Sequence, residues 1–147
     1  RKAFRLFFSQ FFHLRKTLIC MIEDLVRGED ATIKNPFDKA ISLALELREQ
    51  LRFKPIPTNV SNIAIIREYM KTTFAFKNRT QDDLAALPYA TDERVMIGQQ
   101  LLELIMPSVY QANPNMFVLV TLCSARDALK HGLISCVPLV GYATLLW

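Results

Sequence analysis

The sequence has few of the residues that loops, disulfides and nucleotide sites depend on. Four glycines and seven prolines in 147 residues are few for a loop-rich β protein. No glycine-rich phosphate loop is present, so the chain cannot bind a nucleotide in that way. The three cysteines are an odd number and lie inside apolar runs, which favours reduced, buried thiols in a reducing compartment.

No group of side chains has the spacing of a catalytic or metal site. Cys123, His131 and Cys136 match no common zinc pattern and lack a fourth ligand. Asp82 and Asp83 are adjacent acids, but acids at a helix start usually interact with the helix dipole. We therefore expect no enzymatic activity, no cofactor and no metal in this segment.

The positive charge is concentrated at one end. Residues 1–16 carry five basic side chains and no acid, whereas the rest of the chain has 13 basic and 14 acidic side chains. Nucleic-acid binding would require a basic stripe across the fold, so we expect none. The chain opens on Arg1 and ends inside an apolar run, and we interpret it as a piece of a longer protein.

Residues 1–26 form one long amphipathic pattern with aromatic and leucine residues at three- and four-residue steps. We expect a helix that ends at Gly28 and packs on the helices that follow. An aromatic, basic front is also typical of a helix lying on a membrane surface. The alternative function is therefore a membrane-associated protein, anchored through residues 1–16, through the uncharged residues 133–147, or through both. The second run is shorter than a membrane span and contains Pro138, so a buried helix is favoured there.

From residue 36 onward the chain is a series of helix starts and stops. Asn35-Pro36 and Asn113-Pro114 each place a capping residue before a proline, and Gly132 is a typical stop. Thr80 is predicted to cap a short turn, and Ser135 is predicted to cap the last helix. The predicted helices cover about 36–52, 60–77, 91–112, 114–131 and 135–147, with a short turn at 81–87.

The apolar faces of these helices are predicted to be buried between stacked hairpins. In the helix at 60–77 this face comprises Ile63, Ile66, Tyr69, Met70 and Phe74. Residues 116–123 are apolar on every side, which indicates neighbours on both sides of that helix. In the helix at 36–52, Arg48 is predicted to be solvated.

Three residues of the helix at 91–112 are expected to shape its packing. Gly98 would let a neighbouring backbone approach closely. Pro107 should kink or divide the helix. Tyr110, almost one turn later, is predicted to bury its ring against the next helix, so that Tyr110→Ala should cost about 3 kcal/mol or more.

Six short elements follow one another in residues 84–142. They are a leucine-rich turn ending in Leu-Pro, a Thr-Asp step, a Pro-x-x-Tyr element, an Asn-Pro step, a helix end in Lys-His-Gly, and a Gly-Tyr segment. In this order they resemble the helical, tetratricopeptide-like region of large signalling ATPases and hybrid histidine kinases. In that family a protein-kinase-like domain and an AAA-type ATPase module precede the helical region, and GAF and histidine-kinase domains follow it.

The resemblance covers about residues 36–147, and residues 1–35 depart from it. It implies an all-α fold of antiparallel helical hairpins, stacked as a tetratricopeptide-like array that is truncated at its C-terminus. It also implies a cytoplasmic, non-catalytic scaffold that couples a nucleotide-binding module to an output kinase module. The partners would be neighbouring domains of the same chain or other proteins. The residues that carry structure or interaction would be Leu84, Pro88, Pro107, Tyr110, Pro114, Gly132 and Tyr142.

Overall fold

The computed structural model describes residues 36–146, and the helix predicted at 1–26 lies outside this range. The described chain is all-α, as predicted, and contains one isolated parallel bridge between Tyr89 and Leu133 but no strand. The helices are α2 (Pro36–Gln50), α3 (Asn62–Phe76), α4 (Gln81–Ala85), α5 (Glu93–Ala112), α6 (Pro114–His131) and α7 (Val137–Leu145).

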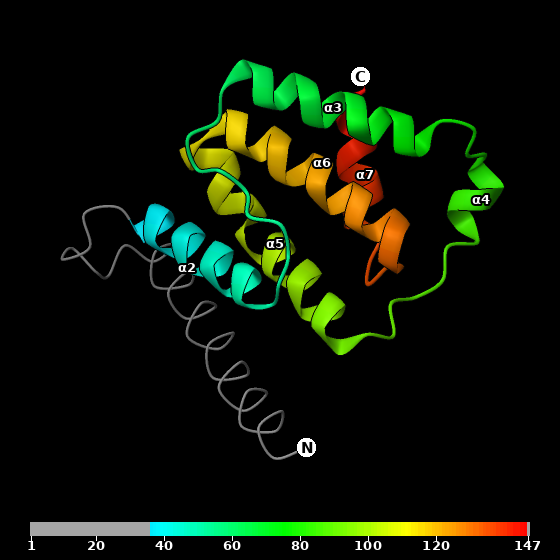
Figure 1. Cartoon of the computed structure of the whole chain (residues 1–147), viewed down its shortest axis with the longest axis horizontal. Helices are drawn as coiled ribbons and strands as arrows, with labels where there is room; N and C mark the ends of the chain where they lie inside the picture. The colour runs from blue at the N-terminus through cyan, green and yellow to red at the C-terminus, as the bar shows by residue number, and fades with distance from the viewer. Residues whose placement is uncertain (1–35, 147) are drawn as a thin grey trace, which may run out of the picture.

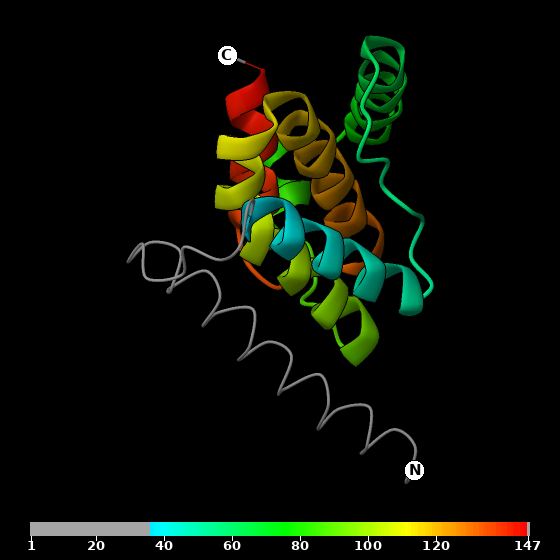
Figure 2. The ribbon, with the colours of Figure 1, turned by 90° about the vertical axis from the view of Figure 1, so that its left-hand side faces the viewer.

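Helix α6 lies at the centre of the molecule. It packs against α3, α5 and α7, and α2 packs against α5 (Figure 1). The first half of α6 is apolar on every side, and this pattern predicted the neighbours that α6 has on both sides. Helices α2 and α3 follow one another in the chain but pack on different helices, α2 on α5 and α3 on α6 (Figure 2). They therefore do not form the hairpin expected of consecutive helices in a stacked array.

Side-chain caps begin α4 at Thr80 and α6 at Asn113, as the sequence predicts, and α3 at Ser61, whereas α7 begins after Cys136 rather than at the predicted Ser135. Ser61 Oγ accepts a hydrogen bond from the backbone N–H of Ala64, and Asn113 Oδ1 accepts one from that of Met116. Thr80 and Asp83 satisfy each other's backbone N–H groups in a capping box at α4. These side chains satisfy helix-end donors that would otherwise lack a partner.

The main core lies between α2, α5 and α6 and is closed by the chain that follows α2. Its centre consists of aliphatic side chains that are almost fully excluded from solvent. The predicted apolar faces of α2, α5 and α6 are the faces that meet there. The fully or nearly fully buried members include Ala40, Ala44, Leu101, Leu102, Ile105, Val109, Leu119 and Val120.

Gly98 permits a close approach, but by a side chain rather than by the backbone that the sequence led us to expect. A Cβ atom at this position would lie 2.4 Å from Cε2 of Phe53. The ring of Phe53 also lies under the guanidinium of Arg48, whose Cζ is 4.6 Å from the ring centroid. Gly98 therefore makes room for the aromatic ring that supports Arg48.

The corner between α5 and α6 differs from its prediction. Helix α5 continues through Pro107 to Ala112 without dividing. Tyr110 is 64% exposed, so the prediction that its ring is buried in a groove between helices is wrong. It makes one edge contact, with the ring of Phe117 at a centroid distance of 5.2 Å. The side chain of Val109, one position earlier, is fully buried instead.

Candidate partner-binding surface

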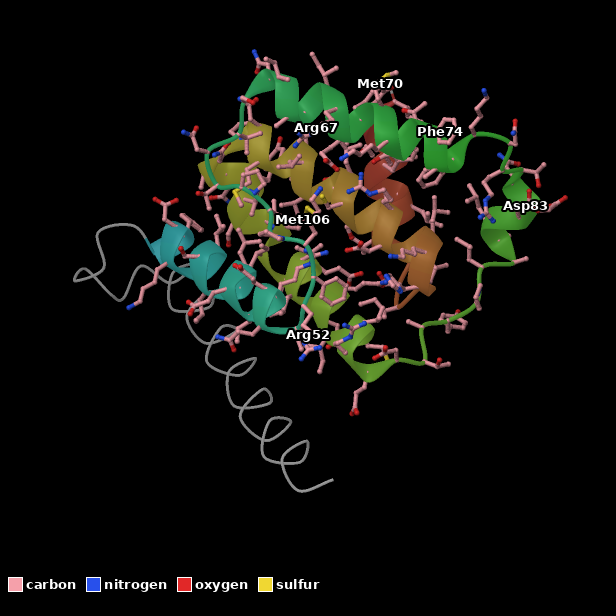
Figure 3. The ribbon with its side chains drawn as sticks, viewed as in Figure 1. Arg52, Arg67, Met70, Phe74, Asp83 and Met106 are labelled. Atoms are coloured by element: carbon pink, nitrogen blue, oxygen red, sulfur yellow. The ribbon has the colours of Figure 1, made fainter. Side chains whose placement is uncertain are left out.

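Helix α3 is oriented opposite to its prediction. Its apolar residues point outward, with Ile63 79% exposed and Phe74 75% exposed, whereas Glu68 and Thr72 are buried. Figure 3 labels two members of this exposed face, Met70 and Phe74. We define the α3 apolar face as Ile63, Ile66, Tyr69, Met70 and Phe74.

The orientation of α3 follows from what α6 presents to it. Arg126 on α6 places Nη1 2.6 Å from Oε2 of Glu68, and Lys71 donates to Oε1 of Glu68 at 2.9 Å. The hydroxyl of Thr72 donates to the Glu68 carbonyl at 2.8 Å and lies 3.4 Å from the Leu122 carbonyl. The Arg126 side chain is 26% exposed, and its charge would lose this carboxylate partner if Glu68 faced outward, so the polar side of α3 faces inward.

The charge state of Glu68 fits this arrangement. Burial would raise the pKa of Glu68, but hydrogen bonds from Lys71 and Arg126, together with their positive charges, outweigh it. The pKa of this carboxyl therefore lies below its ordinary value of 4.5. Glu68 remains ionised at neutral pH and holds α3 to α6.

An apolar groove of about 560 Å³ adjoins the α3 apolar face, between the second half of α3, α4 and α7. Tyr142 forms part of its wall, where its ring stacks on Phe76 at a centroid distance of 4.3 Å. The hydroxyl of Tyr142 lies 3.4 Å from that of Thr73. The other lining side chains are Met70, Phe74, Lys77, Arg79, Leu84, Leu139, Ala143 and Leu146.

The charge around this surface has one sign along α3. Arg67 and Lys71 are 63% and 45% exposed, and Lys77 and Arg79 line the groove. The only acid in residues 62–79 is Glu68, which faces inward. The apolar surface of α3 therefore has a basic border. On the opposite wall, Asp83 of α4 lies near Arg79.

The residues matched to the signalling ATPases fall into three places. Leu84 and Tyr142 line the groove. Pro88 and Gly132 lie close together where the chain before α5 crosses the end of α6. The Pro88 carbonyl accepts a 2.9 Å hydrogen bond from the backbone N–H of Leu133, the residue after Gly132. Pro107, Tyr110 and Pro114 lie at the exposed corner between α5 and α6.

The candidate catalytic and metal residues remain apart. In residues 36–146 no three His, Cys, Asp or Glu side chains are close enough together to hold a metal ion. Burial raises the pKa of Cys123 to about 11, so its thiol stays protonated at neutral pH. Asp83 is occupied in capping α4.

Two buried charged residues were missed or misread from the sequence. Arg48 is buried and pairs with Asp127 of α6, although it was predicted to be solvated. Glu68 lies among exposed apolar residues and gives no sequence signal of burial. The one feature that distinguishes Glu68 is that it is the single acid of α3, which also carries two basic residues.

Comparisons with known proteins give no relative for this chain: no family model matches it, and neither a curated protein nor a solved structure is similar to it. Among the described helices, none combines the length and apolar character needed to cross a bilayer.

Proposed function

We propose that this chain is a non-catalytic helical scaffold that holds a partner polypeptide on the α3 apolar face and in the adjoining groove. One observation carries the proposal. Helix α3 buries a carboxylate and a hydroxyl while exposing isoleucine, methionine and phenylalanine side chains along its length. Contiguous exposed apolar surface of this kind is typical of protein interaction sites.

The partner that fits is an amphipathic helix with acidic residues beside its apolar stripe. Its apolar stripe would cover Ile66, Met70 and Phe74, which recur at four-residue steps along one side of α3. Its acids would lie against the basic border formed by Arg67, Lys71, Lys77 and Arg79. Complementary charge of this kind favours the acidic partner and speeds its encounter.

The resemblance to signalling ATPases supports a particular source for such a helix. In a stacked helical array each unit covers the apolar face of its neighbour. We propose that α3 receives a helix from a neighbouring domain of the same cytoplasmic signalling protein. The segment would thereby couple a nucleotide-binding module to an output kinase module.

A peptide-binding experiment tests the proposal. The probe is a fluorescein-labelled 20-residue peptide with leucine at helical spacing and glutamate on both flanks, and the control peptide carries lysine in place of glutamate. We expect saturable binding of the acidic peptide in fluorescence polarisation. Phe74→Ser should weaken it about tenfold or more, as loss of an aromatic anchor does. The matched control is Val140→Ser on α7, which is 56% exposed and lies outside the groove lining.

Three results would overturn this function. Equal binding of acidic and basic peptides would show that the basic border selects nothing. Concentration-dependent dimerisation that Phe74→Ser abolishes, measured by sedimentation velocity, would assign the surface to a second copy. Co-sedimentation with anionic vesicles that Phe74→Ser abolishes would assign it to a membrane, and loss with Phe8→Glu instead would favour anchoring through residues 1–16.

A further inference from the structure

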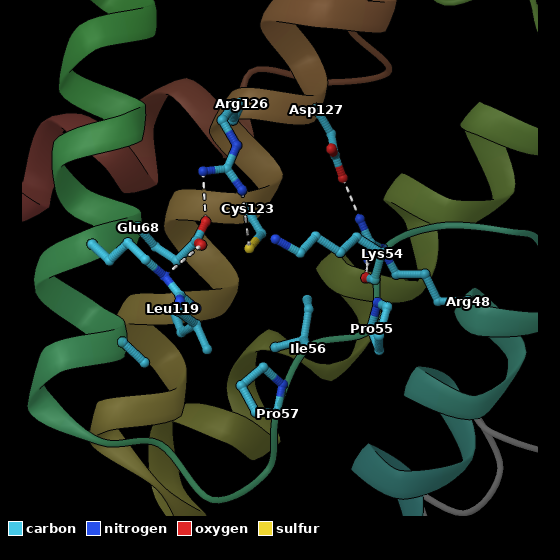
Figure 4. A pocket seen from close by; sticks show the side chains of 12 residues that line it. Arg48, Lys54, Pro55, Ile56, Pro57, Glu68, Leu119, Cys123, Arg126 and Asp127 are labelled. Atoms are coloured by element: carbon cyan, nitrogen blue, oxygen red, sulfur yellow. Dashed lines mark hydrogen bonds and ion pairs between the residues drawn. The ribbon is translucent and has the colours of Figure 1, made fainter.

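A second pocket lies on the other side of α3, between α2, the chain that follows α2, α3 and α6. Figure 4 shows it from close by. Its volume is about 110 Å³, against the roughly 10–15 Å³ that one water molecule requires. It therefore has room for a small ligand. The lining side chains are Arg48, Lys54, Pro55, Ile56, Pro57, Ala64, Arg67, Glu68, Leu119, Cys123, Arg126 and Asp127.

The pocket has more positive than negative charge. Four cationic side chains and two carboxylates line it, which gives a net charge of +2. The two carboxylates are each engaged: Asp127 pairs with Arg48, and Glu68 pairs with Arg126. Arg67 forms a long ion pair with Glu68, with Nε 3.8 Å from Oε1, and Lys54 is the lining cation that pairs with no carboxylate among the described residues.

One of the cationic groups, Arg48, is also held in position. Arg48 is fixed by Asp127, by a 3.0 Å hydrogen bond to the Lys54 carbonyl, and by the ring of Phe53. Its Nε is buried and has no acceptor among the described residues. The side chain of Lys54 extends across the pocket toward α6 (Figure 4). Donors from three elements therefore border one small space, an arrangement suited to an oxyanion.

We propose that this pocket binds a phosphate group, as inorganic phosphate or at the end of a phosphomonoester. Lys54 would supply the unpaired positive charge, Arg67 a second cation that only a long ion pair holds, and Arg48 a buried donor. The neutral thiol of Cys123 adds no opposing charge. Because the bound group would contact α2, α3 and α6 together, it would stabilise the packing of α3 against the other two helices. Arg67 belongs both to this pocket and to the basic border of the α3 apolar face, whereas Lys54 belongs to the pocket alone, so Lys54→Met tests the pocket separately.

Thermal unfolding of the whole 147-residue chain tests the site, with sodium phosphate compared to sodium chloride at equal ionic strength. We expect phosphate, and not chloride, to raise Tm in a saturable way. Glycerol 3-phosphate, tested in parallel, distinguishes the source: tighter binding than phosphate indicates an ester ligand, and weaker binding indicates free phosphate. Either result supports the pocket.

The deciding variants are Lys54→Met and Arg67→Met, both at exposed positions, so that the fold should be retained. Each should raise the Kd for phosphate about tenfold, the usual effect of losing one hydrogen bond to a charged group. Lys39→Met, which removes an exposed cation of α2 outside the pocket, should leave the Kd unchanged. Equal effects of phosphate and chloride, or an unchanged Kd in both pocket variants, would overturn the proposal.

Discussion

Helices α3 and α5 have similar amphipathic sequences but opposite orientations. Helix α5 buries the apolar side that its spacing predicts, with Leu102 and Ile105 at zero exposure. Helix α3 buries Glu68 and Thr72 and leaves its apolar face in solvent. The difference lies in the neighbours: α5 meets the aliphatic sides of α2 and α6, whereas α3 meets Arg126 and a backbone carbonyl of α6. The side of a helix that is buried depends on the polarity of the neighbouring side chains as well as on the spacing of its own apolar residues.

The largest expected effect is on the α5 side of this comparison. Leu102→Ala removes a fully buried side chain from the core and should lower the free energy of unfolding by about 3–4 kcal/mol. Ile66→Ala on α3 is the matched control, since Ile66 is 62% exposed and should change stability by less than about 0.5 kcal/mol. Urea unfolding measures both, and similar losses would show that α3 buries its apolar side after all.

The next effect concerns the ion pair that joins α2 to α6. Asp127→Ala leaves Arg48 buried without its partner and should cost about 2–3 kcal/mol, because the Asp127 side chain is still 20% exposed. In contrast, the double variant Arg48→Met/Asp127→Leu should recover much of the loss, since neither charge remains. If Asp127→Ala alone unfolds at the same urea concentration as the parent, the pair does not contribute to stability.

Gly132→Ala should cost about 2 kcal/mol. Gly132 has φ of +96°, and a Cβ there would lie 2.7 Å from the Pro88 carbonyl oxygen. Gly141→Ala is the control, because Gly141 lies inside α7 and the nearest atom to its Cβ would be a threonine methyl at 3.0 Å. Thermal unfolding should show a much larger decrease in Tm for the first variant.

The stability that the packing of α3 on α6 provides should depend on pH. The pKa of Glu68 is lowered in the folded state, so its contribution to stability is present above the unfolded value of about 4.5 and is lost as pH falls through the folded pKa. Glu68→Gln should reduce stability at pH 7 by on the order of 1 kcal/mol. Urea titrations at several pH values should show this difference shrinking below pH 4.5. A difference that stays constant down to pH 3 would contradict the ionic role of Glu68.

The smallest effects are expected for exposed aromatic residues. Phe74→Ser and Tyr110→Ala should each change the free energy of unfolding by less than about 1 kcal/mol, because both side chains are largely exposed. The structure therefore replaces the sequence-based expectation of 3 kcal/mol or more for Tyr110. Calorimetry on the two variants checks this, and a large loss at Tyr110 would restore the original interpretation.

Much of the fold could be predicted because its signals are local. The starts of α3, α4, α5 and α6 lie at Ser61, Thr80, Asp92 and Asn113, where a side-chain oxygen can satisfy backbone donors a few residues away. Gly132 ends α6 because a glycine readily adopts positive φ. The buried side of α5 was predictable in part because its leucine, isoleucine and valine residues recur at helical spacing, although the structure also buries Gln99 and Ser108.

The candidate site could be predicted only in part. Leu84 and Tyr142 were named from the sequence and line the groove, but the α3 apolar face was expected to be core. Arg48 was expected in solvent because its partner, Asp127, is 79 residues away. Such pairings depend on which helices become neighbours, and short-range patterns do not carry that information.

The sequence by itself determined the all-α class, the helix boundaries within a few residues and the aliphatic composition of the central core. These follow from capping chemistry and periodicity, which act over a few residues. Tertiary structure alone decided that α3 turns its apolar side outward, that Arg48 is buried, and that Tyr110 is exposed. For α3 and Arg48 the physical reason is the pairing of charges that are largely removed from solvent: Arg126 and Asp127 of α6 are 26% and 20% exposed, and they pair with Glu68 and Arg48.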